Sequence, residues 1–132
     1  MSTPCRYGII RFFGMIVLTA FFTVSHAQRT IIRNNEPFWS PDGKKIVFTS
    51  MRDGQSDIYV MNSDGTDQKN LTHHPAGDSK PQWSPDGSKI LFISNRTGTG
   101  RIFTMNPDGS EIMELTHTGV LEFTPAWSPS GR

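Results

Sequence analysis

The hydrophobic positions of this chain fall into short runs that are separated by turn residues. Runs rich in β-branched and aromatic side chains stand at 45–50, 57–61, 89–94 and 101–105. Each run has the length of a strand, and Gly, Pro, Asn and Asp bound it. After residue 27, no stretch shows the helical spacing of apolar residues together with capping residues. The pattern predicts an all-β fold.

Within these runs the apolar residues are consecutive and do not alternate with polar ones. Positions 46–48 read Ile-Val-Phe, and positions 58–60 read Ile-Tyr-Val. A strand with one face in water alternates, whereas a strand that is covered on both faces is apolar throughout. We therefore expect each sheet to be sandwiched between neighbouring sheets.

The same pattern returns forty-four residues later along the chain. "WSPDGKKIVF" at 39–48 becomes "WSPDGSKILF" at 83–92, and "DIYVMNSDG" at 57–65 becomes "RIFTMNPDG" at 101–109. "NLTH" (70–73) likewise lies over "ELTH" (114–117), and a third copy begins with "WSPSG" at 127–131. A repeat of forty to forty-five residues is typical of a propeller blade.

Each period predicts four antiparallel strands: one around the tryptophan, two from the apolar runs, and one around "NLTH" or "ELTH". This divides the chain into blades at 37–80 and 81–124, followed by the start of a third blade at 125–132. Propellers close with four to eight blades, so two repeats and the start of another predict a fragment of a ring.

Asp-Gly pairs recur at the tight turns of both repeats. Ser-Pro-Asp-Gly suits a type I turn, because proline presets the backbone and glycine takes the left-handed exit. Calcium loops are the alternative, but the acidic residues do not have the alternating spacing of an EF-hand. We assign these pairs as structural repeat positions: Asp42, Gly43, Asp64, Gly65, Asp86, Gly87, Asp108 and Gly109.

Trp39, Trp83 and Trp127 occupy one position in each repeat. Three tryptophans could form an aromatic platform for a ligand. Their recurrence favours packing between blades instead, because every blade needs the same large apolar side chain at that place.

His73, His74 and His117 are the candidate metal ligands. His73 and His117 share a repeat position, and Asp78 is close to the first two in sequence. The spacing matches no characteristic zinc site, so a loop histidine without function is the favoured interpretation. We expect no cofactor.

The N-terminus resembles a secretory signal. Arg6 and Arg11 precede the apolar run 12–24, and Ser-His-Ala leads to a predicted cleavage after Ala27. The run is shorter than the roughly twenty apolar residues of a spanning helix, although an uncleaved anchor remains the alternative. Cleavage of the signal peptide, 1–27, would remove Cys5 and leave a short N-terminal segment, 28–36, before the repeats. No stable membrane span would then remain.

Charge and motifs exclude several classes of function. After cleavage, eleven basic residues face twelve acidic ones, so there is no basic excess to hold nucleic acid. The sequence has no Gly-x-Ser-x-Gly elbow and no glycine-rich phosphate loop. The sequons at Asn70 and Asn95 are interpreted as coincidental. We predict a protein that is not an enzyme.

The repeat, "P-x-W-S-P-D-G-x-K-I-x-F-x-S" followed by "I-[YF]-x-M-N-x-D-G" and "L-T-H", resembles the WD-like repeat of the TolB-type β-propeller family. This resemblance spans 37–132. It implies a periplasmic or secreted protein-binding scaffold whose partners belong to the cell envelope.

Two alternatives stay open. Propellers of this type are similar to the gating domains of prolyl-oligopeptidase-like peptidases and to some polysaccharide lyases, so the chain could be the propeller of a larger enzyme. Alternatively, three copies could complete a ring of about six blades, because open blade edges invite self-association.

Overall fold

The computed structural model describes residues 10–12, 15–17, 32–117 and 120–131. The chain divides into two units, Met1–Thr30 and Ile31–Arg132. In the first unit, β1 (Ile10–Phe12) and β2 (Met15–Val17) form an antiparallel hairpin. The predicted cleavage site after Ala27 and the residue Cys5 lie outside the described residues. Within the described part of the chain, no helix has the length and hydropathy needed to cross a membrane.

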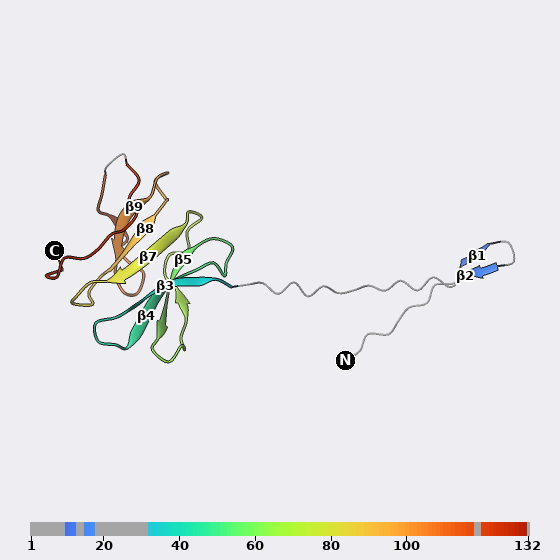
Figure 1. Cartoon of the computed structure of the whole chain (residues 1–132), viewed down its shortest axis with the longest axis horizontal. Helices are drawn as coiled ribbons and strands as arrows, with labels where there is room; N and C mark the ends of the chain where they lie inside the picture. Colours follow the sequence, from blue (N-terminus) through green and yellow to red (C-terminus); the bar gives the residue numbers. More distant parts are fainter. Residues whose placement is uncertain (1–9, 13–14, 18–31, 118–119, 132) are drawn as a thin grey trace. The chain divides into compact units, whose positions relative to one another are not determined.

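The second unit contains two sheets of four antiparallel strands each. The first has the order β3-β4-β5-β6, with β3 (Asn34–Trp39), β4 (Lys45–Ser50), β5 (Asp57–Asn62) and β6 (Lys69–Asn70). The second has the corresponding order, with β7 (Asp78–Trp83), β8 (Ile90–Ser94), β9 (Arg101–Met105) and β10 (Met113–Glu114). Figure 1 shows the two sheets side by side.

These sheets confirm the predicted all-β fold with one four-stranded antiparallel blade per repeat. We call them blade 1 (β3–β6) and blade 2 (β7–β10). The fourth strand is shorter than "NLTH" suggested, since β6 and β10 have two residues each. Thr72 explains where β6 stops: its hydroxyl accepts a hydrogen bond from the backbone N–H of Ile58, in place of a ladder partner.

The consecutive apolar residues cover both faces of each blade. In blade 1, Val47 is paired with Val60 on one face, and Phe48 is paired with Tyr59 on the other. The Val47 face packs against the face of blade 2 that carries the Phe92–Phe103 pair. The cluster between the blades contains Val47, Ile58, Val60, Leu71, Trp83, Ile90, Phe92, Phe103 and Met105. Full burial of side chains this size stabilises the fold by roughly 1.5–3 kcal/mol each.

The stretch from Glu122 to Trp127, which includes the start of the third repeat, lies against blade 2 as β7 lies against blade 1. The N–H of Glu122 donates to the carbonyl of Gly100 at 3.0 Å, and the N–H of Asp78 donates to that of Ser56 at 2.8 Å. Trp127 Nε1 donates to the backbone oxygen of β7 at Gln82, 3.3 Å away. Among the described residues of this repeat, 125–131, no strand is formed.

A bulge interrupts the first strand of each blade. Pairing shifts between Asn35 and Phe38 in β3, and at the equivalent place in β7. Glu36 and Lys80, both at φ 56°, have left-handed backbone immediately before a proline, a conformation that costs non-glycine residues of order 1–3 kcal/mol. A contact between the blades supports it, because the N–H of Lys80 donates to Glu36 Oε2 at 2.8 Å.

Candidate functional site

The Ser-Pro-Asp-Gly turns form one end of the blades, and their aspartates are engaged in local hydrogen bonds. Asp42 Oδ1 accepts from Ser40 Oγ at 2.6 Å and from the Lys44 N–H at 3.1 Å. Asp86 Oδ1 accepts from Ser84 Oγ at 2.7 Å and from the N–H of Ser88 at 3.0 Å. Hydrogen bonds from the serine hydroxyls are the main cause that lowers the pKa of both carboxyls, that of Asp86 to about 2.

The second pair of Asp-Gly turns has the same design. The Thr66 hydroxyl donates to Asp64, and the Ser110 hydroxyl donates to Asp108, each at 2.6 Å. These bonds lower the pKa of both carboxyls. The following glycines have positive φ, 85° at Gly65 and 89° at Gly109. The predicted turn residues therefore lie at turns in the structure.

The three tryptophans differ in exposure according to what covers each blade. Trp83 belongs to the cluster between the blades and is 5% exposed. Its counterpart Trp39 is 55% exposed, and no sheet among the described residues packs on it as blade 1 packs on Trp83. Trp127 is partly covered and bonds to β7.

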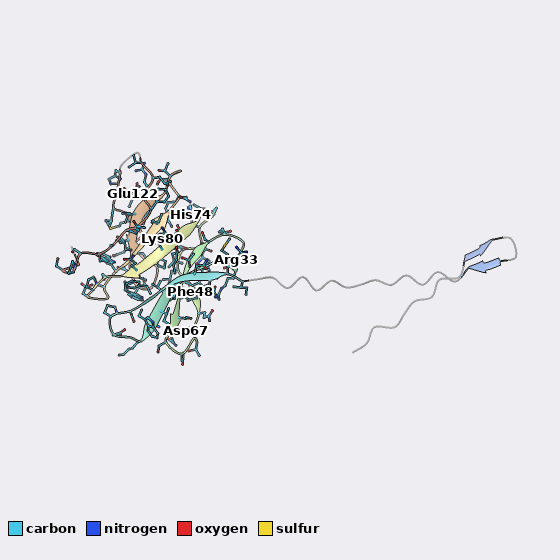
Figure 2. All side chains as sticks on the ribbon, in the orientation of Figure 1. Arg33, Phe48, Asp67, His74, Lys80 and Glu122 are labelled. Carbon is cyan, nitrogen blue, oxygen red and sulfur yellow. The ribbon has the colours of Figure 1, made fainter. Side chains whose placement is uncertain are left out.

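The structure does not bring the candidate histidines into a metal site. His73 is exposed and its N–H donates to Asn70 Oδ1, whereas His74 (Figure 2) uses Nδ1 to accept from the Ala76 N–H. His117 Nδ1 lies 3.6 Å from Glu114 Oε1. Throughout the described ranges, no group of three or more His, Cys, Asp or Glu side chains is placed to hold a metal ion.

A groove of about 270 Å³ follows the first strands of the blades. Lys80 on β7, labelled in Figure 2, lines it together with its partner Glu36. The remaining lining residues are Pro37, Phe38, Pro81, Gln82, Thr124 and Pro125. The groove thus combines apolar rings with polar groups that are already bonded within the chain, because Gln82 Nε2 donates to Pro125, Lys80 Nζ donates to Phe123 and Glu36 accepts from the Lys80 N–H.

The opposite end of the blades is built by residues 51–56, 73–77 and 95–100, which we call the loop end. The histidines at this end were candidates from the sequence, whereas two arginines were not. Arg52 and Arg96 occupy equivalent positions, two residues after the serines that end β4 and β8. The signal that could have revealed them was the Ser-x-Arg-x-Gly sequence, which occurs in both repeats.

Each of these arginines lies over the two rings of its own blade. The Arg52 guanidinium carbon is 4.3 Å from the Tyr59 ring centroid and 5.7 Å from that of Phe48. The Arg96 carbon lies at 5.5 Å from Phe92 and 5.0 Å from Phe103. Such cation–π contacts are worth about 0.5–2 kcal/mol, depending on exposure.

Serine hydroxyls fix the orientation of both guanidinium groups. Arg52 Nε donates to Ser50 Oγ at 3.0 Å, and Arg96 Nε donates to Ser94 Oγ at 2.9 Å. Ser50 and Ser94 are fully buried. The two arginines therefore have one stacked geometry that is repeated blade by blade.

The tyrosine beneath Arg52 joins the loop end to a carboxylate. The Tyr59 hydroxyl donates to Asp53 Oδ2. Burial, and then this hydrogen bond, raise the pKa of Tyr59 to about 12. The same hydrogen bond is the main cause that lowers the pKa of Asp53. Tyr59 therefore remains a neutral donor at physiological pH, and Asp53 is held in place.

Comparison with known proteins agrees with this architecture. The model of the family described as TolB beta propeller domain matches residues 19–132. A putative TolB from Agrobacterium tumefaciens has a similar structure, with a TM-score of 0.71 and 37% identity over 75% of this chain and 36% of that one.

Two relatives match single stretches of the chain. The uncharacterized peptidase YuxL of Bacillus subtilis (strain 168) is 47% identical over 49 residues, which cover 36% of this chain and 8% of that protein. The Tol-Pal system protein TolB of Thioalkalivibrio sulfidiphilus (strain HL-EbGR7) is 40% identical over 50 residues, 35% of this chain and 12% of the relative. The chain therefore spans a small part of these relatives, and the match over 19–132 places it in the TolB β-propeller domain family.

Proposed function

We propose that this chain is a non-enzymatic propeller segment that binds a protein partner of the cell envelope. The observation that carries the proposal is a difference between the two ends of the blades. The Asp-Gly turns are nearly identical in both repeats, and their aspartates are occupied by local bonds. At the loop end the residues differ between repeats and present charged side chains, as binding loops on a rigid scaffold do.

Family membership supports a binding role. One relative is named a Tol-Pal system protein, and the fold supplies a rigid frame for loops. The groove along the first strands offers a second surface, in which prolines and Phe38 lie beside Glu36 and Lys80. On such a frame, the fixed positions and the charges of the loop and groove side chains would select the partner.

The test is capture of a partner by the folded protein. The purified chain, checked by circular dichroism for its β-sheet signal, is immobilised and exposed to a periplasmic extract. A specific envelope protein should be retained and should elute with excess soluble chain. A negative result with folded protein would contradict the binding role.

We also propose that the chain is exported and cleaved after Ala27. The basic start and the short apolar run 12–24 support export. The full chain is expressed in bacteria, the periplasmic fraction is isolated, and the intact mass of the protein is measured. The mass should be that of a chain that begins at Gln28. A mass that still contained residues 1–27 would favour an uncleaved anchor.

The second candidate function is the propeller domain of a larger peptidase or polysaccharide lyase. The 47% identity to a stretch of YuxL, which is named a peptidase, favours this alternative. Reading the coding sequence downstream separates the two. Further repeats that lead into a Gly-x-Ser-x-Gly segment would support the peptidase, and repeats followed by a stop codon would support the scaffold.

The third repeat weighs against a ring of several copies. The stretch that begins at Glu122 and ends at Trp127 already lies beside blade 2, where β3 of a second copy would have to pack. Ring closure by copies would need this stretch to be displaced. We therefore expect a monomer in light scattering, and a trimer would restore the ring model.

A further inference from the structure

The two repeats differ more at the loop end than along the Ser-Pro-Asp-Gly turn and the strand that follows it. From Trp39 to Phe48, eight of ten residues are identical to their counterparts at 83–92, whereas only Arg52 and Gly54 of 51–56 have identical counterparts in 95–100. Divergence on a constant frame marks the positions where one blade does something that its neighbour does not. The loop end is therefore the place to look for a function specific to one blade.

The difference that matters most here is the charge beside the stacked arginines. In blade 2, Arg96 Nη2 lies 3.2 Å from Asp78 Oδ2 and 3.4 Å from Oδ1. Asp78 is fully buried, and the Arg96 side chain is 15% exposed. One edge of the guanidinium group is thus bonded to a serine and another to a carboxylate.

Blade 1 has the same arginine without that carboxylate. Asn34 stands at the repeat position of Asp78, and each is paired with the serine that ends the next strand. In the part of the chain that the structure describes, Arg52 has no ion pair within 4.0 Å. The nearby carboxylate of Asp53 is bonded to the hydroxyl of Tyr59 instead.

We propose that Arg52 is an anchor for a carboxylate of an acidic peptide segment. The two rings and Ser50 already hold its guanidinium group in one orientation, so little side-chain entropy remains to be lost on binding. The Nη atoms supply the fork that matches a carboxylate with two parallel hydrogen bonds. Blade 2 shows that this arginine position can hold a carboxylate, since Arg96 Nη2 alone contacts both oxygens of Asp78.

This inference rests on the proposed binding function, since it names the chemistry that the loop end recognises. It also explains why Arg52 keeps the geometry of Arg96 although its carboxylate partner is replaced by Asn34. If Arg52 served only to cover the two rings, its Nη atoms would not need to face outward for a partner. Arg52 is partly exposed, so a partner segment can reach it.

The test follows the arginine Nε–Hε signals of the ¹⁵N-labelled full chain by NMR. The probe is the blocked peptide acetyl-Gly-Glu-Gly-Glu-amide, and the control is the same peptide with glutamine in place of glutamate. We expect a saturable shift of the Arg52 signal with the glutamate peptide and none with the glutamine peptide. The Arg96 signal should move little, because Asp78 already occupies its guanidinium group.

Two variants sharpen the result. Arg52→Gln should weaken association of the glutamate peptide by about tenfold, the loss expected for a charge-assisted hydrogen bond. Lys44→Gln removes an exposed cation at the opposite end and should leave association unchanged. Equal shifts of Arg52 and Arg96, equal effects of the two peptides, or an unmoved Arg52 signal would each overturn the proposal.

Failure of this inference can be told apart from failure of the proposed function. If the wild-type chain and Arg52→Gln retain the same envelope protein equally well, the binding function stands and the anchor is wrong. If the folded wild-type chain retains no partner, the binding function itself fails, whatever the NMR titration shows.

Discussion

Arg101 and Glu114 form in blade 2 the link that Asp57 and Asn70 form in blade 1. Arg101 Nη1 donates to Glu114 Oε1 at 2.9 Å, and Asn70 Nδ2 donates to Asp57 Oδ2 at 2.9 Å. Both pairs join the start of the third strand of the blade to the end of the fourth. The direction of donation is reversed between blades, so the two positions have changed together.

This relationship predicts that the pair can be exchanged only as a unit. The substitution Asn70→Glu would place a new carboxylate beside Asp57, which is 1% exposed. Asp57 would also lose the hydrogen bond that the Asn70 amide donates to it. An uncompensated buried charge costs roughly 3 kcal/mol. Adding Asp57→Arg recreates the blade 2 pair and should recover most of that loss, as urea unfolding of the single and double variants would measure.

The control for this cycle is the single variant Asp57→Arg. It should also be destabilised, because the new guanidinium group would lie beside an amide and not a carboxylate. Additive effects of the two single changes would show that these positions do not interact.

Gly65 and Gly109 form a matched pair for testing how a turn contributes to contact between blades. Both have positive φ, but a Cβ on Gly65 meets nothing within 4 Å, whereas one on Gly109 would lie 2.7 Å from the carbonyl oxygen of Leu71. Gly65→Ala should cost about 1 kcal/mol for its backbone conformation alone. Gly109→Ala should cost clearly more in thermal unfolding, and equal losses would contradict the contact between blades.

Trp39 and Trp83 allow burial to be varied at one repeat position. Trp83 is 5% exposed and Trp39 is 55% exposed. Trp83→Ala should therefore destabilise the fold by about 3–5 kcal/mol, and Trp39→Ala by much less. Chemical denaturation followed by circular dichroism measures both losses. A larger loss for Trp39 would mean that its exposed face is covered in solution.

The Asp-Gly turns predict a loss of stability in acid. The pKa of Asp86 is lowered to about 2, and the pKa values of Asp42, Asp64 and Asp108 are also below the ordinary value. A lowered pKa in the folded state adds stability above the unfolded pKa, and that stability is lost as pH falls toward the folded value. The temperature of the thermal unfolding midpoint should therefore decrease as the pH is lowered from about 4 toward 2.

Asp86→Asn and Asp67→Asn separate this effect from general charge. Asp86→Asn should flatten the fall in stability between those pH values. Asp67→Asn removes an exposed carboxylate that makes no side-chain hydrogen bond with another described residue, and should leave the profile nearly unchanged. If both variants had the same dependence of stability on pH, groups other than Asp86 would be responsible for the loss of stability in acid.

Sequence alone predicted the blades because their information is local and repeated. The runs at 45–50 and 89–94 predicted β4 and β8 closely, since β-branched residues and flanking turns act within a few positions. The continuous apolar pattern predicted a neighbouring sheet on each face, and the Val47 face of blade 1 does pack against blade 2. On the other face Phe48 is covered by Arg52 of its own blade.

The loop end was harder to predict because its contacts join residues far apart in sequence. Arg96 is eighteen residues from Asp78, and no local pattern shows that Asn34 replaces that partner in blade 1. The left-handed backbone of Glu36 was equally hidden, because a contact with Lys80 forty-four residues away supports it. Short-range rules cannot detect such contacts.

The bulges in β3 and β7 have a consequence for solubility. β3 and β7 form the margins of their sheets, and a flat margin is a template on which further strands polymerise. Pro37 and Pro81 carry no backbone N–H, and the kink before each of them spoils the straight row of donors and acceptors that fibril growth requires. The prolines and bulges of these two edge strands therefore disfavour the addition of further strands to them.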